Sequence, residues 1–490
     1  MGDLERLIED VESGPQGPDV GAFFDFDGTL ISGYSARAWY GERLRRLQVG
    51  PGELARTLIA GVEMNVNGAD VTRFMEIAVQ AWAGRAADEI EELGERLFVQ
   101  QIAGMVYPQA DPLVRAHRRA GHTIAIASSA TPFQVAPLAR ELGIANLLCT
   151  EVEVVNGVAT GKLAGPVLWG TGKAQAVREF AEARDLDLER SYAYGNGKED
   201  VPYLETVGRP RPLNPDGGLI GIARERGWET YRFPSHGRPG PLSVARTGAA
   251  LWGLTGVVAA SVGLGLLTRS RRTAANVAIG AGADTALALA GVNLNVRGEE
   301  NLWSQRPAVF IFNHQSSLDM LIVGSLVRRD MTGVAKKEAR RDPRFAPVGL
   351  LTDVAYIDRR NSTKARSALA PVVEKIRDER MSLAIAPEGT RTPTPRLGRF
   401  KKGAFHIAMQ SEVPIVPIVI RNAGELMWRG SNVVRSGTVD VVVLPPVPTD
   451  TWRVEDLDRH VAAMRAAYAS TFEELGDPLG SAAPEAVARA

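Results

Sequence analysis

Two stretches of this chain combine residue types that could do chemistry, and they lie far apart in the sequence. In the first, Asp25 and Asp27 follow an apolar run. In the second, the apolar run Phe310–Phe312 is followed by His314, with Asp319 five residues later. Two carboxylates close together can share a hard cation, and a histidine supported by a carboxylate can take a proton from a hydroxyl. The sequence therefore indicates two catalytic modules.

The first pair of carboxylates is expected at the end of a buried strand. Val20–Phe24 is a short apolar run, which is typical of a parallel strand covered on both faces. Ligands of open α/β sheets bind at the carboxyl ends of the strands, where Asp25 and Asp27 follow. Because side chains alternate along extended backbone, both carboxylates should lie on one side.

Later segments continue the α/β pattern and place further polar side chains at element ends. They are Thr123–Ala127 followed by Ser128, a helix that begins near Thr171 and carries Lys173, and Ser191–Tyr194 followed by Asn196 and Asp200. Residues 32 to about 105 are mostly helical in pattern and interrupt this alternation, so we expect an inserted cap.

This order of motifs resembles the haloacid dehalogenase superfamily, and the cap position resembles its phosphoserine phosphatase-like branch. The resemblance covers residues 18 to about 232 and implies a Rossmann-like α/β domain with a helical cap. It implies that Asp25 is the nucleophile that forms an aspartyl-phosphate and that Asp27 is the general acid and base. Ser128 and Lys173 would hold the phosphoryl oxygens.

The same resemblance implies Mg2+ as cofactor, with Asp25, Asp27, Asn196 and Asp200 as its ligands. The family usually has an aspartate where this chain has Asn196, so one negative charge is missing from a site that holds hard cations largely by charge. Two interpretations stay open. This module is a magnesium-dependent phosphatase, or it is a non-catalytic module that binds phosphorylated ligands for regulation.

Composition sets the limits for the whole chain of 490 residues, which is too long for one core. Its 57 basic and 57 acidic residues balance, so no global charge recruits nucleic acid. The single cysteine, Cys149, excludes an intrachain disulfide and indicates a reducing cytoplasm, and the polar N-terminus makes export unexpected.

The chain is predicted to divide into four parts. They are a first module at 1–235, a linker with apolar helices at 236–291, a second module at 292–475, and a flexible tail at 476–490.

Two apolar stretches, Gly248–Leu267 and Thr273–Ala290, lie between the modules and are separated by three arginines. The first is long enough to span a bilayer, but a cationic turn is a poor candidate for crossing one. We expect a helical pair that lies in or dips into the cytoplasmic leaflet, which places the chain at the cytoplasmic face of the cell membrane. The alternative is a buried pair of core helices.

The second module begins with strands predicted at Val292–Val296 and Pro307–Phe312. Ser316 is the predicted N-cap of the next helix, which puts Asp319 in its first turn. Residues five apart on a helix point about 140° away from each other, so His314 must stand on the turn before the helix. From its position Asp319 could then hold one imidazole nitrogen and leave the other free to accept a proton.

Three further stretches follow: Val354–Arg359, Leu383–Arg391 and Val413–Ile420. Together with His314 and Asp319, they closely resemble the glycerolphosphate acyltransferase family, specifically its 1-acylglycerol-3-phosphate acyltransferases, over residues 292 to 450. The resemblance implies an α/β acyltransferase domain that needs no metal. His314 would be the general base for the free hydroxyl of a lysophospholipid, oriented by Asp319, and the alkoxide would attack the thioester of acyl-CoA or acyl carrier protein.

By the same resemblance, several residues would bind the acceptor: Lys336, Arg359, Glu388, Gly389, Thr390 and Arg391. The sequence as a whole predicts a membrane-associated phosphatidic acid-forming acyltransferase fused to a phosphatase-like domain. An alternative stays open in which phosphoester hydrolysis is the main activity.

Overall fold

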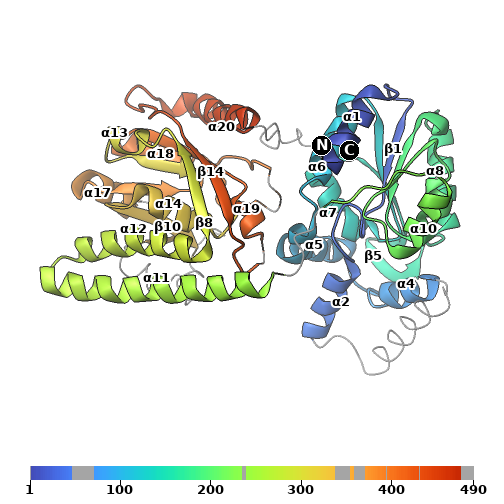
Figure 1. The fold of residues 1–490 in the computed structure, drawn as a ribbon, viewed down its shortest axis with the longest axis horizontal. Helices are drawn as coiled ribbons and strands as arrows, with labels where there is room; N and C mark the ends of the chain where they lie inside the picture. The colour runs from blue at the N-terminus through green and yellow to red at the C-terminus, as the bar shows by residue number, and fades with distance from the viewer. Residues whose placement is uncertain are drawn as a thin grey trace. The chain divides into compact units, whose positions relative to one another are not determined.

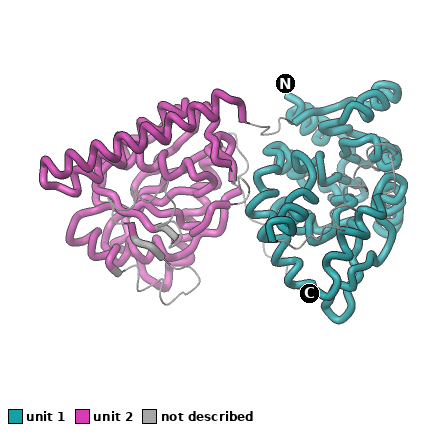
Figure 2. The backbone as a smooth tube through the Cα atoms, turned by 90° about the horizontal axis from the view of Figure 1, so that it is seen from below, with its two compact units in different colours: residues 1–237 teal, residues 238–490 magenta. Residues whose placement is uncertain are grey.

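The computed structural model describes residues 2–46, 71–233, 239–336, 354–357, 370–392, 394, 396–429 and 431–475. The chain forms two compact units, Met1–Gly237 and Arg238–Ala490, which Figure 2 draws in different colours. The apolar helices belong to the second unit. The predicted tail at 476–490 lies outside the described residues.

The first unit is built on a parallel sheet with the strand order β3-β2-β1-β6-β7. Every residue of the central strand β1 is buried, because separate apolar clusters cover the two faces of the sheet. The strands are β1 Gly21–Phe24, β2 Thr123–Ser128, β3 Asn146–Cys149, β6 Tyr192–Gly195 and β7 Arg209–Pro212. The predicted Rossmann-like α/β fold is confirmed for this unit.

Helices flank this sheet, and a helical insertion follows β1 as predicted (Figure 1). The flanking helices are α1 Asp3–Ser13, α6 Ala110–Arg119, α7 Pro132–Leu142, α8 Thr171–Glu182, α9 Val201–Leu204 and α10 Gly217–Glu225, with the short turns η3 Leu188–Arg190 and η4 Lys198–Asp200. The insertion contains α2 Ala36–Arg45, α4 Val71–Gln80, α5 Ala87–Leu97, η1 Phe98–Ile102 and η2 Ala103–Met105.

A hairpin that the sequence did not predict packs against the insertion. Its strands, β4 Val152–Val155 and β5 Val158–Leu163, pair antiparallel, and β5 contacts α4. Asn156 and Gly157 both have positive φ at the turn, which is typical of the tight connections that join antiparallel strands.

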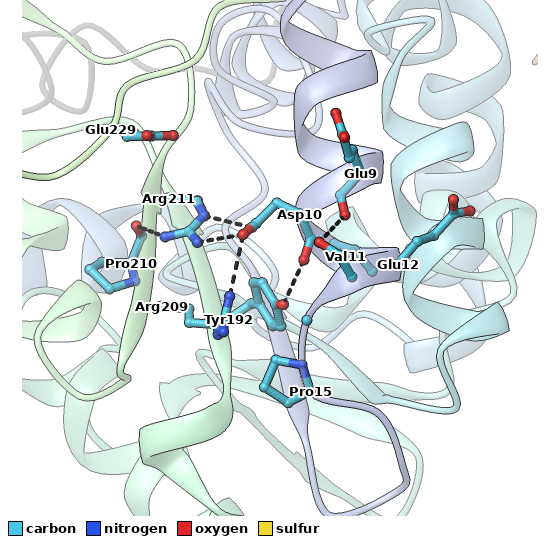
Figure 3. A network of polar contacts seen from close by, with 12 residues as sticks. Glu9, Asp10, Val11, Glu12, Pro15, Tyr192, Arg209, Pro210, Arg211 and Glu229 are labelled. Carbon is cyan, nitrogen blue, oxygen red and sulfur yellow. Dashed lines mark hydrogen bonds and ion pairs between the residues drawn. The ribbon is translucent and has the colours of Figure 1, made fainter.

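The N-terminal helix α1 is fastened to the edge of the sheet by one carboxylate, Asp10 (Figure 3). Arg211 donates to both of its oxygens, at 2.9 and 3.0 Å, and Arg209 donates at 3.3 Å. The Tyr192 hydroxyl donates to the Asp10 carbonyl at 3.2 Å. Two-pronged pairing of this kind gives an arginine–carboxylate contact geometric specificity, so α1 has a defined register on β6 and β7.

Two buried histidines form a directed hydrogen-bond chain behind β1 and β6. His122 Nε2 lies 2.8 Å from the Pro15 carbonyl, which can only accept, so His122 Nδ1 must accept from His117 Nδ1 at 2.8 Å. His117 Nε2 then accepts from the Tyr194 hydroxyl at 2.7 Å. Burial lowers the pKa of both histidines, that of His117 well below its ordinary 6.5, so both are neutral in the folded chain.

The second unit is built on a sheet with the strand order β11-β10-β12-β9-β13-β14-β8. Only β13 and β14 pair antiparallel in this order; each of the other neighbouring pairs is parallel. The strands are β8 Val292–Arg297, β9 Val309–Phe312, β10 Met331–Lys336, β11 Ala355–Ile357, β12 Ser382–Ile385, β13 Ile415–Arg421 and β14 Gly437–Val443. The predicted second α/β domain is confirmed.

The helices of this unit pack against the sheet over two apolar clusters. They are α11 Pro241–Thr268, α12 Arg271–Ala290, α13 Asn301–Ser304, α14 Asp319–Val327, α17 Ala370–Asp378, α18 Gly403–Ser411, α19 Ala423–Leu426, η6 Val454–Asp456 and α20 Leu457–Glu474.

The predicted N-cap of α14 is wrong. The helix begins at Asp319 with Leu318 as its N-cap, so Ser316 stands before the cap. The Ser316 hydroxyl instead accepts from the Leu318 amide at 3.1 Å and donates to the Met427 carbonyl at 2.6 Å. The placement of Asp319 in the first turn is confirmed.

The two apolar helices α11 and α12 lie side by side, yet their surroundings differ (Figure 1). Half of α12 is buried against α11 and α14, and its acid Asp284 pairs with Arg328 at 2.8 Å. The outer face of α11 carries Trp252 and Leu267, which are 80% and 85% exposed. Among the described residues, α11 alone is long and apolar enough to cross a membrane.

The histidine chain predicts a pH-dependent stability of the first unit. Because the folded histidines are neutral while unfolded ones take up a proton near pH 6.5, the stability present above pH 6.5 is lost as the pH falls below it. In His122→Gln, whose amide can donate to Pro15 and accept from His117 without titrating, urea unfolding should lose less stability between pH 7.5 and 5. His460→Gln, in the second unit, is the matched control. An unchanged pH slope in His122→Gln would contradict the assignment.

Candidate active sites

In the first unit, Asp25 follows β1 and is buried beside a buried lysine. The Asp25 amide donates to the Tyr194 carbonyl of β6 at 2.8 Å, which fixes the turn against the sheet. Lys173, from the first turn of α8, donates to Asp25 Oδ1 at 2.7 Å and to Asp200 Oδ1 at 2.6 Å. Burial raises the pKa of Asp25 to about 7, against the opposing charge of Lys173.

Lys173 itself stays charged between the two carboxylates. Burial alone would favour the neutral amine, but Asp200 and Asp25 raise the pKa of Lys173 above its ordinary value. The other oxygen of Asp200 accepts from the backbone amides of Asn196 and Gly197 at 3.0 and 3.2 Å. The predicted meeting of the ends of β1 and β6 with the start of α8 is therefore present in the structure.

Asp27 is held by groups that the sequence did not single out. Ser35, just before α2, donates to the Asp27 carboxylate from its amide at 2.7 Å and from its hydroxyl at 3.2 Å. Gln134 of α7 donates to that hydroxyl at 3.1 Å. Burial raises the pKa of Asp27 to about 6, which suits a group that gives and takes protons near neutral pH. No sequence motif marked Ser35 or Gln134, since their contact depends on the insertion folding back over β1.

The surroundings of Asn196 show whether the residues present fit a magnesium ion. Its side-chain amide faces three oxygens, Asp27 O at 2.9 Å and Asp25 Oδ2 and Thr29 Oγ1 at 3.3 Å each. If the amide nitrogen of Asn196 faces these oxygens, it donates hydrogen bonds to them. If the amide oxygen faces them, four oxygens converge, including that of Asn196, and a hard cation would stabilise this arrangement. Gly28 permits this approach, since a methyl group there would lie 2.2 Å from Asn196.

These donors fit Mg2+ but supply less charge than the family pattern does. Within the residues described, no three His, Cys, Asp or Glu side chains group as metal ligands, and Asn196 is neutral where the family pattern has an aspartate. Ser128 ends β2 beside β1 and is buried, with its hydroxyl accepting from the Ala130 amide at 3.1 Å. Its contact with a phosphoryl group stays a prediction.

In the second unit, His314 stands on the turn between β9 and α14, as predicted. The preceding residue, Asn313, exchanges two hydrogen bonds with Ile420 of β13, at 2.7 and 2.8 Å, which fixes the end of β9. His314 Nδ1 lies 2.9 Å from Asp319 Oδ2. A carboxylate oxygen accepts, so Nδ1 carries the proton and Nε2 keeps its lone pair.

Asp319 is fully buried, and one oxygen holds several donors at once. Besides the imidazole, Oδ2 accepts from the amides of Gln315 and Ser316, at 2.8 Å each. Three donors therefore converge on one oxygen at the start of the helix and fix the orientation of this side chain. The His314 side chain is one-fifth exposed, and only its Nδ1 is engaged by Asp319.

The segment after β12 holds the backbone of His314 from both sides. Glu388 Oε1 accepts from the His314 amide at 2.8 Å, and the Thr392 amide donates to the His314 carbonyl at 2.9 Å. Glu388 Oε2 accepts from the Gly398 amide at 2.9 Å. Glu388 is buried, which raises its pKa to about 7, and both its oxygens already serve backbone groups.

Of the remaining predicted acceptor-binding residues, some lie at the histidine turn and others do not. Gly389 has φ +73°, which permits the tight turn, and Arg391 Nη1 donates to Ser317 Oγ at 2.7 Å. Thr390 is exposed, and Lys336 ends β10. Arg359 lies outside the described residues. Acceptor binding by these residues and by Glu388 stays a prediction.

The geometry defines two enzyme-like sites, an aspartate and lysine site on a Rossmann-like sheet and a histidine–aspartate site on a second α/β unit. Family models match both: haloacid dehalogenase-like hydrolase over residues 22–205 and acyltransferase over residues 293–421. The chain therefore belongs to the haloacid dehalogenase-like hydrolases through its first unit and to the acyltransferases through its second.

Curated relatives divide along the same line. A phosphoserine phosphatase of Mycobacterium tuberculosis is 35% identical over 241 residues, covering 47% of this chain and 78% of that protein. A 1-acyl-sn-glycerol-3-phosphate acyltransferase of Limnanthes alba is 36% identical over 194 residues, covering 39% of this chain and 68% of that protein.

Solved structures are also similar, among them a 1-acyl-sn-glycerophosphate acyltransferase of Thermotoga maritima. It matches with a TM-score of 0.40 and 22% identity, covering 48% of this chain and 97% of that one.

Proposed function

We propose that the chain is a membrane-associated fusion enzyme. Its second unit transfers an acyl group from acyl-CoA or acyl carrier protein to the free hydroxyl of 1-acylglycerol 3-phosphate and forms phosphatidic acid. Its first unit hydrolyses a phosphomonoester. The observation that carries the acyltransferase assignment is the contact of His314 Nδ1 with Asp319, which leaves Nε2 of a partly exposed side chain to act as the base.

The acyl transfer needs only groups of this chain and the two substrates. His314 Nε2 takes the proton of the acceptor hydroxyl while Asp319 stabilises the imidazolium that forms. The oxygen attacks the thioester carbonyl, a C–O bond forms, and the C–S bond breaks as the thiolate leaves and takes the proton. Glu388 and Thr392 contribute by holding the backbone of the base in one place.

In the first unit, Asp25 would attack the phosphorus of the substrate while Asp27 protonates the leaving oxygen. Asp27 would then take a proton from the water that hydrolyses the aspartyl-phosphate. Mg2+, held by Asp25, the Asp27 carbonyl, Asn196 and Asp200, would offset negative charge on the transferring group. Lys173 already supplies one fixed positive charge at this place.

Membrane association is supported by α11 and not by the pair of helices together. The exposed side chains Trp252, Leu266 and Leu267 lie on its outer face, whereas α12 is packed within the unit. The arginine turn is tied down in part, since Arg272 pairs with Asp330 at 2.6 Å. We therefore place α11 in the surface of the cytoplasmic leaflet, with its apolar side chains among the lipids.

Replacement of the base tests the acyl transfer. In His314→Ala, conversion of lysophosphatidic acid and acyl-CoA to phosphatidic acid should fall at least about a hundredfold, the usual scale for a lost general base. The matched control is His460→Ala on α20, a histidine stacked on Trp452, which should keep its turnover. Unchanged turnover in His314→Ala would contradict the role of His314 as general base.

The first unit is tested by the charge at the metal site. With phosphoserine and a lipid phosphate as substrates, Asp25→Asn should abolish phosphate release, since the nucleophile is lost. Asn196→Asp should lower the Mg2+ concentration that gives half-maximal rate, because it restores a charge among hard ligands. Wild-type protein that binds a phosphate mimic without turnover, with turnover appearing in Asn196→Asp, would support the regulatory alternative instead.

Substitution on α11 tests membrane association without disturbing α12. The triple variant Trp252→Ser, Leu266→Ser, Leu267→Ser should lower co-sedimentation with anionic lipid vesicles at least about tenfold, since each large apolar side chain contributes about 1.5–3 kcal/mol on burial. Val454→Ser, which changes an exposed apolar residue elsewhere in the unit, is the control. Undiminished binding of the triple variant would rule out α11 as the anchor.

A further inference from the structure

A short segment after α19 lies directly on the turn that carries His314. The Met427 carbonyl accepts from the Ser316 hydroxyl at 2.6 Å, two residues beyond the catalytic histidine. Two residues further along, Arg429 Nη1 donates to the Arg391 carbonyl at 2.5 Å. This segment was not singled out by the sequence, because Arg429 stands in no motif.

The contact brings two arginines together beside the histidine turn. Arg391 is itself bonded to that turn, with its Nη1 donating to Ser317 Oγ at 2.7 Å. Arg429 is partly buried, and among the described residues no acidic side chain lies within ion-pair distance of it. Burial and the neighbouring charge of Arg391 lower the pKa of Arg429 to about 10.

The two arginines are close enough for the charge of Arg391 to lower the pKa of Arg429, and Arg429 has no carboxylate partner among the described residues. This arrangement costs free energy in the substrate-free protein. An anion placed between them removes that cost. Guanidinium groups present planar forks of donors that match the oxygens of a phosphate monoester. Of the anions that enter an acyl transfer of the proposed kind, phosphate groups are carried by both the acceptor and the acyl donor.

We propose that Arg429 binds the phosphate group of a substrate together with Arg391, as a substrate-binding residue of the acyltransferase site. This proposal rests on the proposed acyltransferase function.

The attachment of the segment favours the lipid acceptor as the source of the phosphate. Beyond Arg429, Val434 exchanges hydrogen bonds with Thr247 of α11: its amide donates to the Thr247 hydroxyl at 2.9 Å, and that hydroxyl lies 3.4 Å from its carbonyl. The loop that carries Arg429 is therefore fixed to the helix with the exposed apolar face. A phosphate bound there would belong to a molecule that enters from the same surface.

The test separates KM from kcat for both substrates. In Arg429→Gln, the KM for lysophosphatidic acid should rise about tenfold to a hundredfold, the range for one lost charged hydrogen bond, while kcat changes little. Arg429→Lys keeps the charge but not the fork and should lie in between. Arg459→Gln, an exposed arginine on α20, is the matched control. A rise in the KM for acyl-CoA instead would assign the donor phosphates to Arg429.

Direct binding keeps this proposal separate from the activity on which it rests. Titration of wild-type protein with glycerol 3-phosphate by calorimetry should show binding that weakens about tenfold or more in Arg429→Gln and is restored in part in Arg429→Lys. Thermal unfolding of each variant reports whether the loop still folds. If a folded Arg429→Gln variant has the wild-type KM for both substrates and the wild-type affinity for glycerol 3-phosphate, the proposal is overturned. Wild-type protein that binds glycerol 3-phosphate but has no acyltransferase activity would contradict the acyl transfer alone.

Discussion

The acyltransferase unit depends on how the backbone of one residue, His314, is held. Its amide is bound by Glu388 and its carbonyl by Thr392, so the segment after β12 fixes the turn after β9. The buried carboxylate of Glu388 is costly unless its oxygens are satisfied, and both accept backbone amides. Once the backbone is fixed, a single oxygen of Asp319 sets the tautomer of the imidazole. Glu388 therefore has a structural role in holding this turn that does not depend on acceptor binding.

In the hydrolase unit, the side chains of the site are held in place by opposite charges. Asp25 and Asp200 are both buried carboxyl groups, and Lys173 lies between them within 2.7 Å of each. Such a lysine offsets like-charge repulsion in the same place where a phosphoryl group and a cation would enter. Replacement of a carboxylate by Asn196 leaves the lysine with a larger share of the local charge balance, which is why magnesium affinity is the informative measurement for this unit.

Sequence patterns predicted the elements whose residues carry local signals, and they missed contacts made over long separations. The strand before Asp25, the turn of His314 and the first-turn position of Asp319 follow from apolar runs and helix periodicity. Ser316 carried the signal of an N-cap, but its hydroxyl bonds Met427, more than a hundred residues away. Ser35 on Asp27 and Arg429 on Arg391 depend in the same way on segments that meet only after folding.

The apolar helices show most clearly why composition alone could not decide their role. Both stretches are apolar in composition, yet α12 carries small residues where it meets its neighbours: a methyl group on Gly324 of α14 would lie 3.4 Å from Ala283. Small side chains permit close helix packing in a soluble core as well as in a bilayer. What separates the helices is the exposure of large side chains such as Trp252 on α11, which no partner within the described unit covers. The apolar surface of α11 that the described residues leave open is the feature on which the proposed membrane association rests, because large exposed apolar patches are typical of interaction surfaces.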